Sequence, residues 1–177
     1  MQQTRTCTRC LMDTTAKDIS FFKNGCCNYC TDFELLLDTE RDKKSNSCRD
    51  SFLKKVKNSR GENRYDCIMG LSGGVDSAYS IYLAKNHGLK PLAVHLDNGW
   101  NSELAVDNIN RIVKHLDIDL YTHVINWEEN KDLQKSFFKA NVIDIELLLD
   151  NAILALSYQI AAKEKVKWIL SGLNSAT

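Results

Sequence analysis

The chain has 177 residues, and its hydrophobic share of 44% is that of a globular protein. Its 23 Lys and Arg residues balance its 23 Asp and Glu residues, so bulk charge predicts neither a nucleic-acid-binding nor a membrane-binding surface. No apolar run reaches the length of a membrane span, and the polar N-terminus does not resemble a signal peptide. We therefore expect a cytoplasmic protein made of one ordinary domain and a small module.

Two C-x-x-C pairs stand near the N-terminus, Cys7 with Cys10 and Cys27 with Cys30, and 16 residues separate the pairs. Each pair can offer two thiolates to one metal, and together they close a tetrahedral shell. We expect one structural Zn²⁺ in a module formed by residues 1–31, with Cys26 as a bystander because only Cys27 keeps the two-residue spacing. Unliganded reduced thiols are the alternative, and a disulfide or redox role is less favoured.

Residues 32–63 are charged and helix-prone, which predicts a helical connector of one or two helices. A polar break is expected at 42–47 and a loop at 58–63. The basic residues of this connector are typical of a solvated helix face.

From residue 64 the pattern alternates between strand and helix, which predicts a parallel, doubly wound α/β domain over residues 64–177. Ser102 is a plausible N-cap for one of the helices. The expected strands are 67–71, 91–96, 120–125 and 167–170, and the expected helices are 75–86, 102–115, 129–140 and 145–163.

A glycine turn, Ser72-Gly73-Gly74, joins the first expected strand to the first helix of this domain. Unpaired N–H groups at a helix N-terminus favour an anion, and glycines allow close approach of a ligand. The sequence therefore predicts a phosphate or pyrophosphate site. It is neither a Walker loop, because the lysine is missing, nor a G-x-G-x-x-G turn. An ordinary tight turn is the alternative.

The polar tips that follow the first, second and fourth expected strands should meet at one edge of the sheet, where ligands of doubly wound folds bind. Asp76 has a plainer interpretation as a first-turn helix acid, and residues 97–99 as an ordinary turn. The candidate nucleotide-binding residues are Ser72, Gly73, Gly74, Val75, Asp76, Ser77, Asp97, Asn98, Gly99, Gly172, Asn174 and Thr177.

The hexapeptide Ser-Gly-Gly-Val-Asp-Ser, residues 72–77, resembles the pyrophosphate loop of the N-type ATP pyrophosphatases, or PP-loop enzymes. Together with the two cysteine pairs, the stretches at 95–103, 120–128 and 171–177 resemble the N-acetyl sugar amidotransferases of surface-polysaccharide and flagellin-glycan biosynthesis. The resemblance spans nearly the whole chain and is weakest at 31–60. It implies an adenine nucleotide alpha hydrolase-like fold.

The resemblance also implies a reaction. ATP adenylates the acetamido oxygen of a sugar and releases pyrophosphate, and ammonia then displaces AMP to leave an acetamidino group. ATP and Mg²⁺ are the implied cofactors, and Asp76 and Ser77 are the candidate catalytic residues. The acceptor would be a nucleotide-linked N-acetyl sugar or a nonulosonic acid. The implied partners are glutaminase and ammonia-channel subunits resembling those of histidine biosynthesis, with no nucleic acid and no membrane.

Four aromatic side chains near the expected edge have two interpretations each. Trp100 and Trp127 could line the acceptor site, although tryptophans more often belong to the core. His95 and His123 occupy expected strand positions, which favours structural roles with satisfied hydrogen bonds.

The family continues well beyond the point where this sequence stops, so we expect a missing C-terminal part that holds most acceptor-binding residues. Two other functions compete. A PP-loop tRNA thiolation enzyme usually needs catalytic-domain cysteines, and no cysteine follows Cys67 here. A non-catalytic zinc and nucleotide scaffold of a glutaminase complex is the third hypothesis, which ATP turnover would distinguish.

Overall fold

The computed structural model describes residues 4–43 and 46–172, without the side chains of residues 40–47. It contains two compact units, Met1–Phe52 and Leu53–Thr177, which are described separately. The division into a module at 1–31, a connector at 32–63 and a domain at 64–177 stays a prediction. Within the described ranges, no helix combines the length and the apolar character that crossing a bilayer requires.

The first unit contains little regular structure before its helices. Antiparallel bridges join Thr6 to Asp13 and Phe21 to Cys27, and α1 follows at Asn28–Lys43. Helix α2, Asn46–Asn58, crosses the boundary between the units, so the connector forms two helices. The polar break predicted at 42–47 falls in part on residues 44–45, which lie outside the described residues.

Cysteines form the interior of the first unit. Among residues 4–39, the buried side chains are those of Cys7, Cys27 and Cys30. Ile19 and Phe21 pack against them but are only partly buried. So small an apolar core contributes little hydrophobic free energy, and the unit needs another source of stability.

The second unit is a parallel sheet of four strands in the order β3-β2-β1-β4. Every boundary lies within two residues of its prediction, and the largest shortenings, of two residues each, are at the starts of the helix predicted at 145–163 and the strand predicted at 167–170. The elements are β1 Cys67–Gly70, α3 Val75–Asn86, β2 Pro91–Asp97, α4 Glu103–Leu116, β3 Asp119–Val124, α5 Trp127–Lys139, α6 Leu147–Lys163 and β4 Ile169–Leu170.

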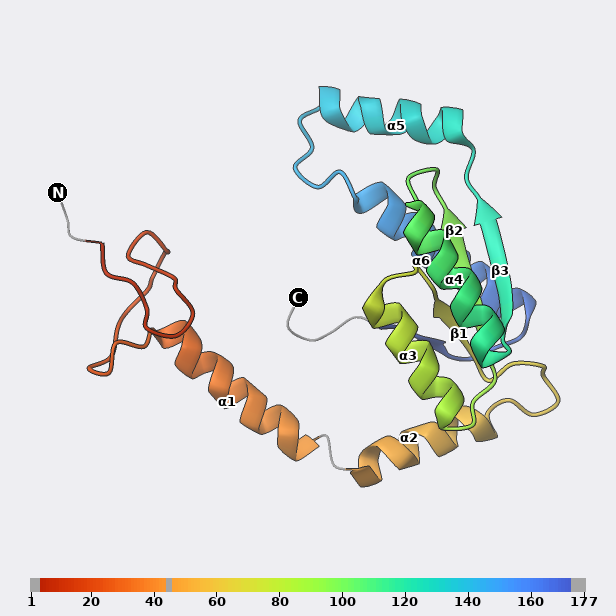
Figure 1. The fold of residues 1–177 in the computed structure, drawn as a ribbon, viewed down its shortest axis with the longest axis horizontal. Helices are drawn as coiled ribbons and strands as arrows, with labels where there is room; N and C mark the ends of the chain where they lie inside the picture. Colours follow the sequence, from red (N-terminus) through yellow and green to blue (C-terminus); the bar gives the residue numbers. More distant parts are fainter. Residues whose placement is uncertain (1–3, 44–45, 173–177) are drawn as a thin grey trace. The chain divides into compact units, whose positions relative to one another are not determined.

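Helices cover both faces of this sheet (Figure 1). Because successive strand residues point to opposite faces, Cys67 and Met69 of β1 face one core, with α3 and α4, and Ile68 faces the other. The second core holds Leu156 and Ile160 of α6. The doubly wound α/β architecture predicted from the alternating pattern is therefore confirmed.

The order of the strands reverses next to β1. The chain proceeds from β1 to β2 and β3 on one side, then returns through α6 to place β4 on the other side of β1. In open parallel sheets, ligands bind at such a reversal, beyond the carboxyl ends of the strands. The phosphate loop after β1 lies at this point.

Ser102 caps α4 as its sequence position predicts, because its side chain accepts a hydrogen bond from the Ala105 N–H at 3.2 Å. Replacing Ser102 with alanine should lower the free energy of unfolding by about 1 kcal/mol. Urea unfolding followed by circular dichroism measures this loss. Ser136→Ala in α5 is the control, since that hydroxyl only bonds the Asp132 carbonyl within its own helix. Equal losses in the two variants would contradict the capping role.

A candidate nucleotide site and a candidate metal site

The phosphate loop runs from the end of β1 to the first turn of α3. Gly73 has a φ of +81°, a region that L-residues rarely adopt, and Gly74 is the helix N-cap in extended conformation. No side chain caps this helix start. The N–H groups of the first turn therefore remain available to an anion, with the positive end of the helix dipole behind them.

Hydrogen bonds between the two serines close the loop. The Ser77 hydroxyl donates to the Gly74 carbonyl at 3.1 Å, so the Ser72 hydroxyl is the donor across the 3.1 Å that separates the two oxygens. The N–H groups of Ser72 and Gly74 donate to Ser77 Oγ and Ser72 Oγ at 3.3 and 3.4 Å. The loop thus holds its shape through its own contacts.

The two glycines of the loop serve different purposes. A Cβ on Gly73 would lie 2.4 Å from the Ala105 carbonyl oxygen, and Asn108 Nδ2 donates to the Gly73 carbonyl at 3.1 Å. Gly73 is therefore required by the approach of α4. A Cβ on Gly74 would meet only Ser72 Oγ, at 3.5 Å, so this position is open toward a ligand.

A cavity of about 520 Å³ opens beside the loop, a volume usual for a cofactor site. Five of the predicted residues line it: Ser72, Asp76, Ser77, Asn98 and Gly172. Loops that follow β1, β2 and β4 thus contribute to one cavity, as the rule for parallel sheets predicts.

The other predicted residues that the structure describes do not line the cavity. Asp97 shapes the turn after β2, where its carboxylate accepts hydrogen bonds from the Gly99 N–H and Asn101 Nδ2, both at 3.1 Å. Val75 is 78% exposed at the start of α3. Asn174 and Thr177 lie outside the described residues.

Sequence reasoning missed the wall that α6 and the residue before it contribute, through Glu146, Leu149, Asp150 and Ile153. It also missed Asn101. This asparagine lines the cavity while its Nδ2 lies 3.3 Å from His95 Nε2. The motif Asp-Asn-Gly-Trp-Asn carries a signal for it, because an asparagine four residues after Asp97 can return to the strand end.

The two histidines and the two tryptophans named in the sequence analysis differ in how far they are buried. His95 is buried, and its Nδ1 donates to the Leu71 carbonyl at 2.9 Å, so the predicted structural role fits. His123 lies exposed in β3. Trp100 and Trp127 are 63% and 39% exposed, so the core interpretation is wrong for both. Their rings meet edge to face, with centroids 5.3 Å apart.

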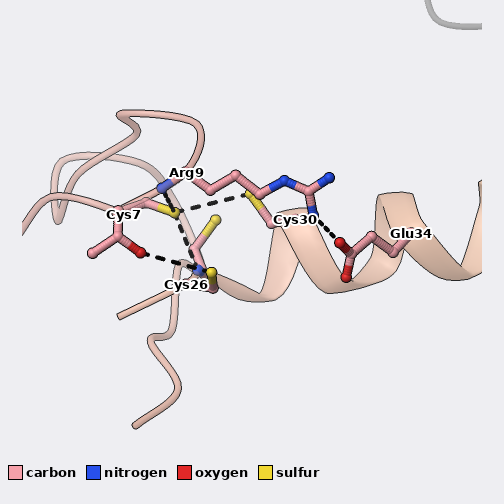
Figure 2. Close-up of polar contacts among 7 residues, drawn as sticks. Cys7, Arg9, Cys26, Cys30 and Glu34 are labelled. Atoms are coloured by element: carbon pink, nitrogen blue, oxygen red, sulfur yellow. Dashed lines mark hydrogen bonds and ion pairs between the residues drawn. The ribbon is translucent and has the colours of Figure 1, made fainter. Parts of the chain in front are cut away.

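The four predicted metal ligands come together in the first unit, and Figure 2 shows Cys7 and Cys30 among them. Their sulfur atoms all lie within 4.8 Å of one another, with 3.9 Å between Cys7 and Cys30 and 3.6 Å between Cys10 and Cys27. Four sulfurs bound tetrahedrally at about 2.3 Å would be about 3.8 Å apart, so the cluster fits one metal ion. The Cys26 sulfur lies apart from it, 3.7 Å from the Thr8 hydroxyl.

Backbone N–H groups polarise the cluster. Hydrogen bonding to the backbone at Cys10 and Arg9 lowers the pKa of Cys7 to about 6, which favours the thiolate that a metal needs. Burial raises the pKa of Cys30 to about 12, so this thiol must release a proton when metal binds. Beside the cluster, Arg9 forms an ion pair with Glu34 (Figure 2).

The nucleotide cavity offers a magnesium ion fewer protein ligands than the cysteine cluster offers its metal. Among the described residues, the cysteine cluster is the one group of three or more ligating side chains close enough to hold a metal. Asp76, Glu146 and Asp150 line the nucleotide cavity. Mg²⁺ is often bound through one or two carboxylates together with substrate phosphates, and these residues fit that arrangement.

Comparisons with known proteins bear on this fold. A family model described as queuosine biosynthesis protein QueC matches residues 66–167. The tRNA-specific 2-thiouridylase MnmA 2 of Clostridium botulinum is 34% identical over 82 residues, which cover 43% of this chain and 21% of that protein. The chain thus spans about a fifth of the length of this curated relative.

Two solved structures share the fold at low identity. Glutamine-dependent NAD⁺ synthetase from Acinetobacter baumannii in complex with ADP has a TM-score of 0.56 at 17% identity, over 73% of this chain and 24% of that chain. The U34-tRNA thiolase NcsA from Methanococcus maripaludis has a TM-score of 0.50 at 15% identity, over 97% of this chain and 55% of that chain.

The phosphate loop, the cavity beside it and the family match at 66–167 place the chain among the PP-loop proteins of the ATP pyrophosphatase type, and the solved neighbours share its fold. The QueC model begins at the residue before β1 and ends two residues before β4, and this match exceeds half of the chain. The chain therefore belongs to the QueC family of PP-loop proteins.

Proposed function

We propose that the chain is the ATP-binding part of an amidotransferase that converts the N-acetyl group of a sugar into an acetamidino group, in the biosynthesis of a surface glycan. The acceptor is a nucleotide-linked N-acetyl sugar or a nonulosonic acid. The amide oxygen attacks the α-phosphate of ATP, and pyrophosphate leaves. Ammonia then adds to the activated carbon, and AMP departs with the oxygen.

The observation that carries the proposal is the position of the cysteine in the α/β unit. Cys67 is the only cysteine of residues 53–177, and its side chain is fully buried at the amino end of β1. The cavity begins at the other end of that strand, at Gly70. Among the described residues of the second unit, no thiol therefore borders the cavity to carry sulfur, whereas nitrogen transfer from ammonia needs none.

The residues around the cavity suit phosphate chemistry. The open first turn of α3 supplies preorganised N–H donors where negative charge grows on the leaving pyrophosphate. The hydroxyls of Ser72 and Ser77 keep the loop in place for this task. Asp76, which lines the same cavity, orients the loop or a water molecule bound to Mg²⁺.

The remaining parts of the proposal concern metal and partners. Zn²⁺ is the expected ion of the cysteine cluster because it prefers four tetrahedral thiolates in structural sites. Ammonia would come from a glutaminase subunit through a channel-forming partner. A protein with the same fold, from Campylobacter jejuni, is named as an NH₃-dependent NAD synthetase, which supports ammonia as a nucleophile on this scaffold.

Transfer of sulfur to tRNA is the second candidate. It is favoured by the likeness to the thiolase NcsA, which extends over 97% of the chain and so includes the cysteine-rich unit. The thiouridylase MnmA 2 is a further relative with this activity in its name. Both candidates share ATP-dependent adenylation of an oxygen, and they differ in the acceptor.

The test measures AMP and pyrophosphate released from α-labelled ATP with ammonium present. One pool of acceptors holds nucleotide-linked N-acetyl sugars and nonulosonic acids, and the other holds tRNA. We expect turnover with a sugar, and a decrease of at least tenfold in Asp76→Asn, because this carboxylate lines the cavity. Asp107→Asn is the control, since Asp107 pairs with Arg111 on the surface of α4.

The outcomes separate the candidates. Turnover with tRNA alone would replace the proposal by the thiolation function. Release of AMP in neither pool, with a glutaminase partner supplied and ATP still bound, would reject turnover by these 177 residues alone, and would favour a scaffold or a requirement for the C-terminal part expected from the resemblance.

A further inference from the structure

The turn after β2 carries one aromatic residue between two residues that line the nucleotide cavity. Asn98 and Asn101 line the cavity, and Trp100 stands between them in the chain. The Trp100 side chain is 63% exposed, which is unusual for so large an apolar group. An exposed indole beside a ligand cavity calls for an explanation in terms of binding.

The turn that carries Trp100 is fixed by hydrogen bonds. The Trp100 N–H donates to Asn98 Oδ1 at 3.0 Å, and the Gly99 N–H donates to Asp97 Oδ1 at 3.1 Å. Asn101 Nδ2 donates to the same carboxylate oxygen at 3.1 Å. The turn is therefore held by three hydrogen bonds, two of them from its backbone N–H groups, and the indole starts from a defined position.

A second indole supports the first from α5. The ring planes of Trp100 and Trp127 meet at 67°, with centroids 5.3 Å apart. Gly99, with a φ of +79°, makes room for this contact, because a Cβ there would lie 3.1 Å from Trp127 Cε3. Trp127 thus limits the motion of the Trp100 ring while most of the Trp100 surface stays open to solvent.

We propose that Trp100 is a stacking platform for a planar nucleobase at the edge of the cavity. The base belongs either to the nucleotide-linked acceptor or to ATP, and the first assignment rests on the proposed function. An aromatic ring held in place loses little conformational freedom when a base stacks on it, so its contribution to affinity is large. With the first assignment, Trp100 is a specificity-determining residue that favours acceptors carrying a base.

The experiment titrates the full chain with three probes, ATP, UDP-N-acetylglucosamine and free N-acetylglucosamine, and follows tryptophan fluorescence together with calorimetry. Stacking on Trp100 should quench its fluorescence and alter the circular dichroism of the Trp100–Trp127 pair. We expect Trp100→Ala to weaken binding of a probe that contains a base by about five- to hundredfold. Trp100→Phe should keep most of the affinity, because it keeps an aromatic ring.

Tyr158→Ala is the matched control, since Tyr158 is also 63% exposed but lies on α6, away from the turn after β2 that carries Asn98 and Asn101. A loss confined to ATP would assign the base to ATP, and a loss confined to UDP-N-acetylglucosamine would assign it to the acceptor. Unchanged affinity of Trp100→Ala for both probes would overturn the platform, and so would an absence of binding and quenching in the unmodified chain.

These results are separable from the proposed reaction. Weakened base binding in Trp100→Ala without sugar-dependent AMP release by the unmodified chain would retain the platform and reject the amidotransferase. The opposite result would be sugar-dependent AMP release with the same KM in Trp100→Ala and the unmodified chain, together with unchanged binding of ATP and UDP-N-acetylglucosamine. That result would retain the amidotransferase and reject the platform.

Discussion

Replacing Cys7 and Cys30 together with serine is expected to unfold the first unit and to leave the α/β unit folded. The reason is the composition of the interior, since the buried side chains among residues 4–39 are cysteines that would hold the metal. Without the metal, little apolar contact remains to offset the loss of chain entropy. Hydrogen exchange resolved by segment should show complete loss of amide protection in 4–39 and unchanged protection in β1.

Cys26→Ser is the matched control for this variant. Cys26 is adjacent to a ligand in sequence, but its sulfur lies outside the cluster, so metal content and protection should remain as in the unmodified chain. Elemental analysis of the unmodified chain should find close to one Zn²⁺ per chain. Metal content well below one equivalent, or equal loss in both variants, would contradict a four-cysteine site.

The same site predicts a dependence on pH. Since backbone hydrogen bonds lower the pKa of Cys7 to about 6, its thiolate persists through neutral pH, and protonation competes with the metal as the pH falls below that value. The stabilisation of the first unit should therefore be present at neutral pH and lost in acid. Metal uptake at neutral pH should also release protons, because the pKa of Cys30 is raised.

Gly74→Val should weaken ATP binding at least tenfold while the α/β unit stays folded. Gly74 has a φ of −81°, which any L-residue adopts, and a side chain there meets only Ser72 Oγ. The added methyl groups would stand where a phosphate must approach the first turn of α3. Calorimetric titration with ATP measures the loss, and urea unfolding verifies the fold.

Gly73→Ala is the contrasting variant, and it should fail for a different reason. Its φ is positive and its Cβ would clash with the Ala105 carbonyl, so the expected result is a less stable unit. A decrease in ATP affinity in Gly73→Ala alone would reflect damage to the folded unit and not the loss of a phosphate contact. Unchanged ATP affinity in Gly74→Val would reject the assignment of this loop to phosphates.

The sequence predicted the elements of the α/β unit well, because its strands are short apolar runs and its helices have local signals. Ser102 begins α4, and the glycine turn after β1 leads into α3 at Val75. The four cysteines also came together as their spacing predicts, since a C-x-x-C turn fixes two thiolates locally and only two turns had to meet.

Contacts across the sheet could not be predicted in the same way. Asp150 and Ile153 reach the cavity because the chain crosses to the second face before β4, and the apolar sequence of α6 does not show which side faces the cavity. Gly73 was assigned to a ligand, yet α4 packs where its side chain would be. The contribution of α6 to the cavity and the packing of α4 against Gly73 both depend on how closely elements far apart in sequence approach each other in the fold.

The burial of Cys67 has a consequence for oxidative chemistry. Its thiol is inaccessible, and burial raises its pKa to about 12, so it stays protonated and unreactive toward oxidants and alkylating agents. Cys10 and Cys48 are exposed residues and are the more accessible targets. Oxidative damage would therefore release the metal of the first unit first, while the nucleotide cavity of the second kept its chemistry.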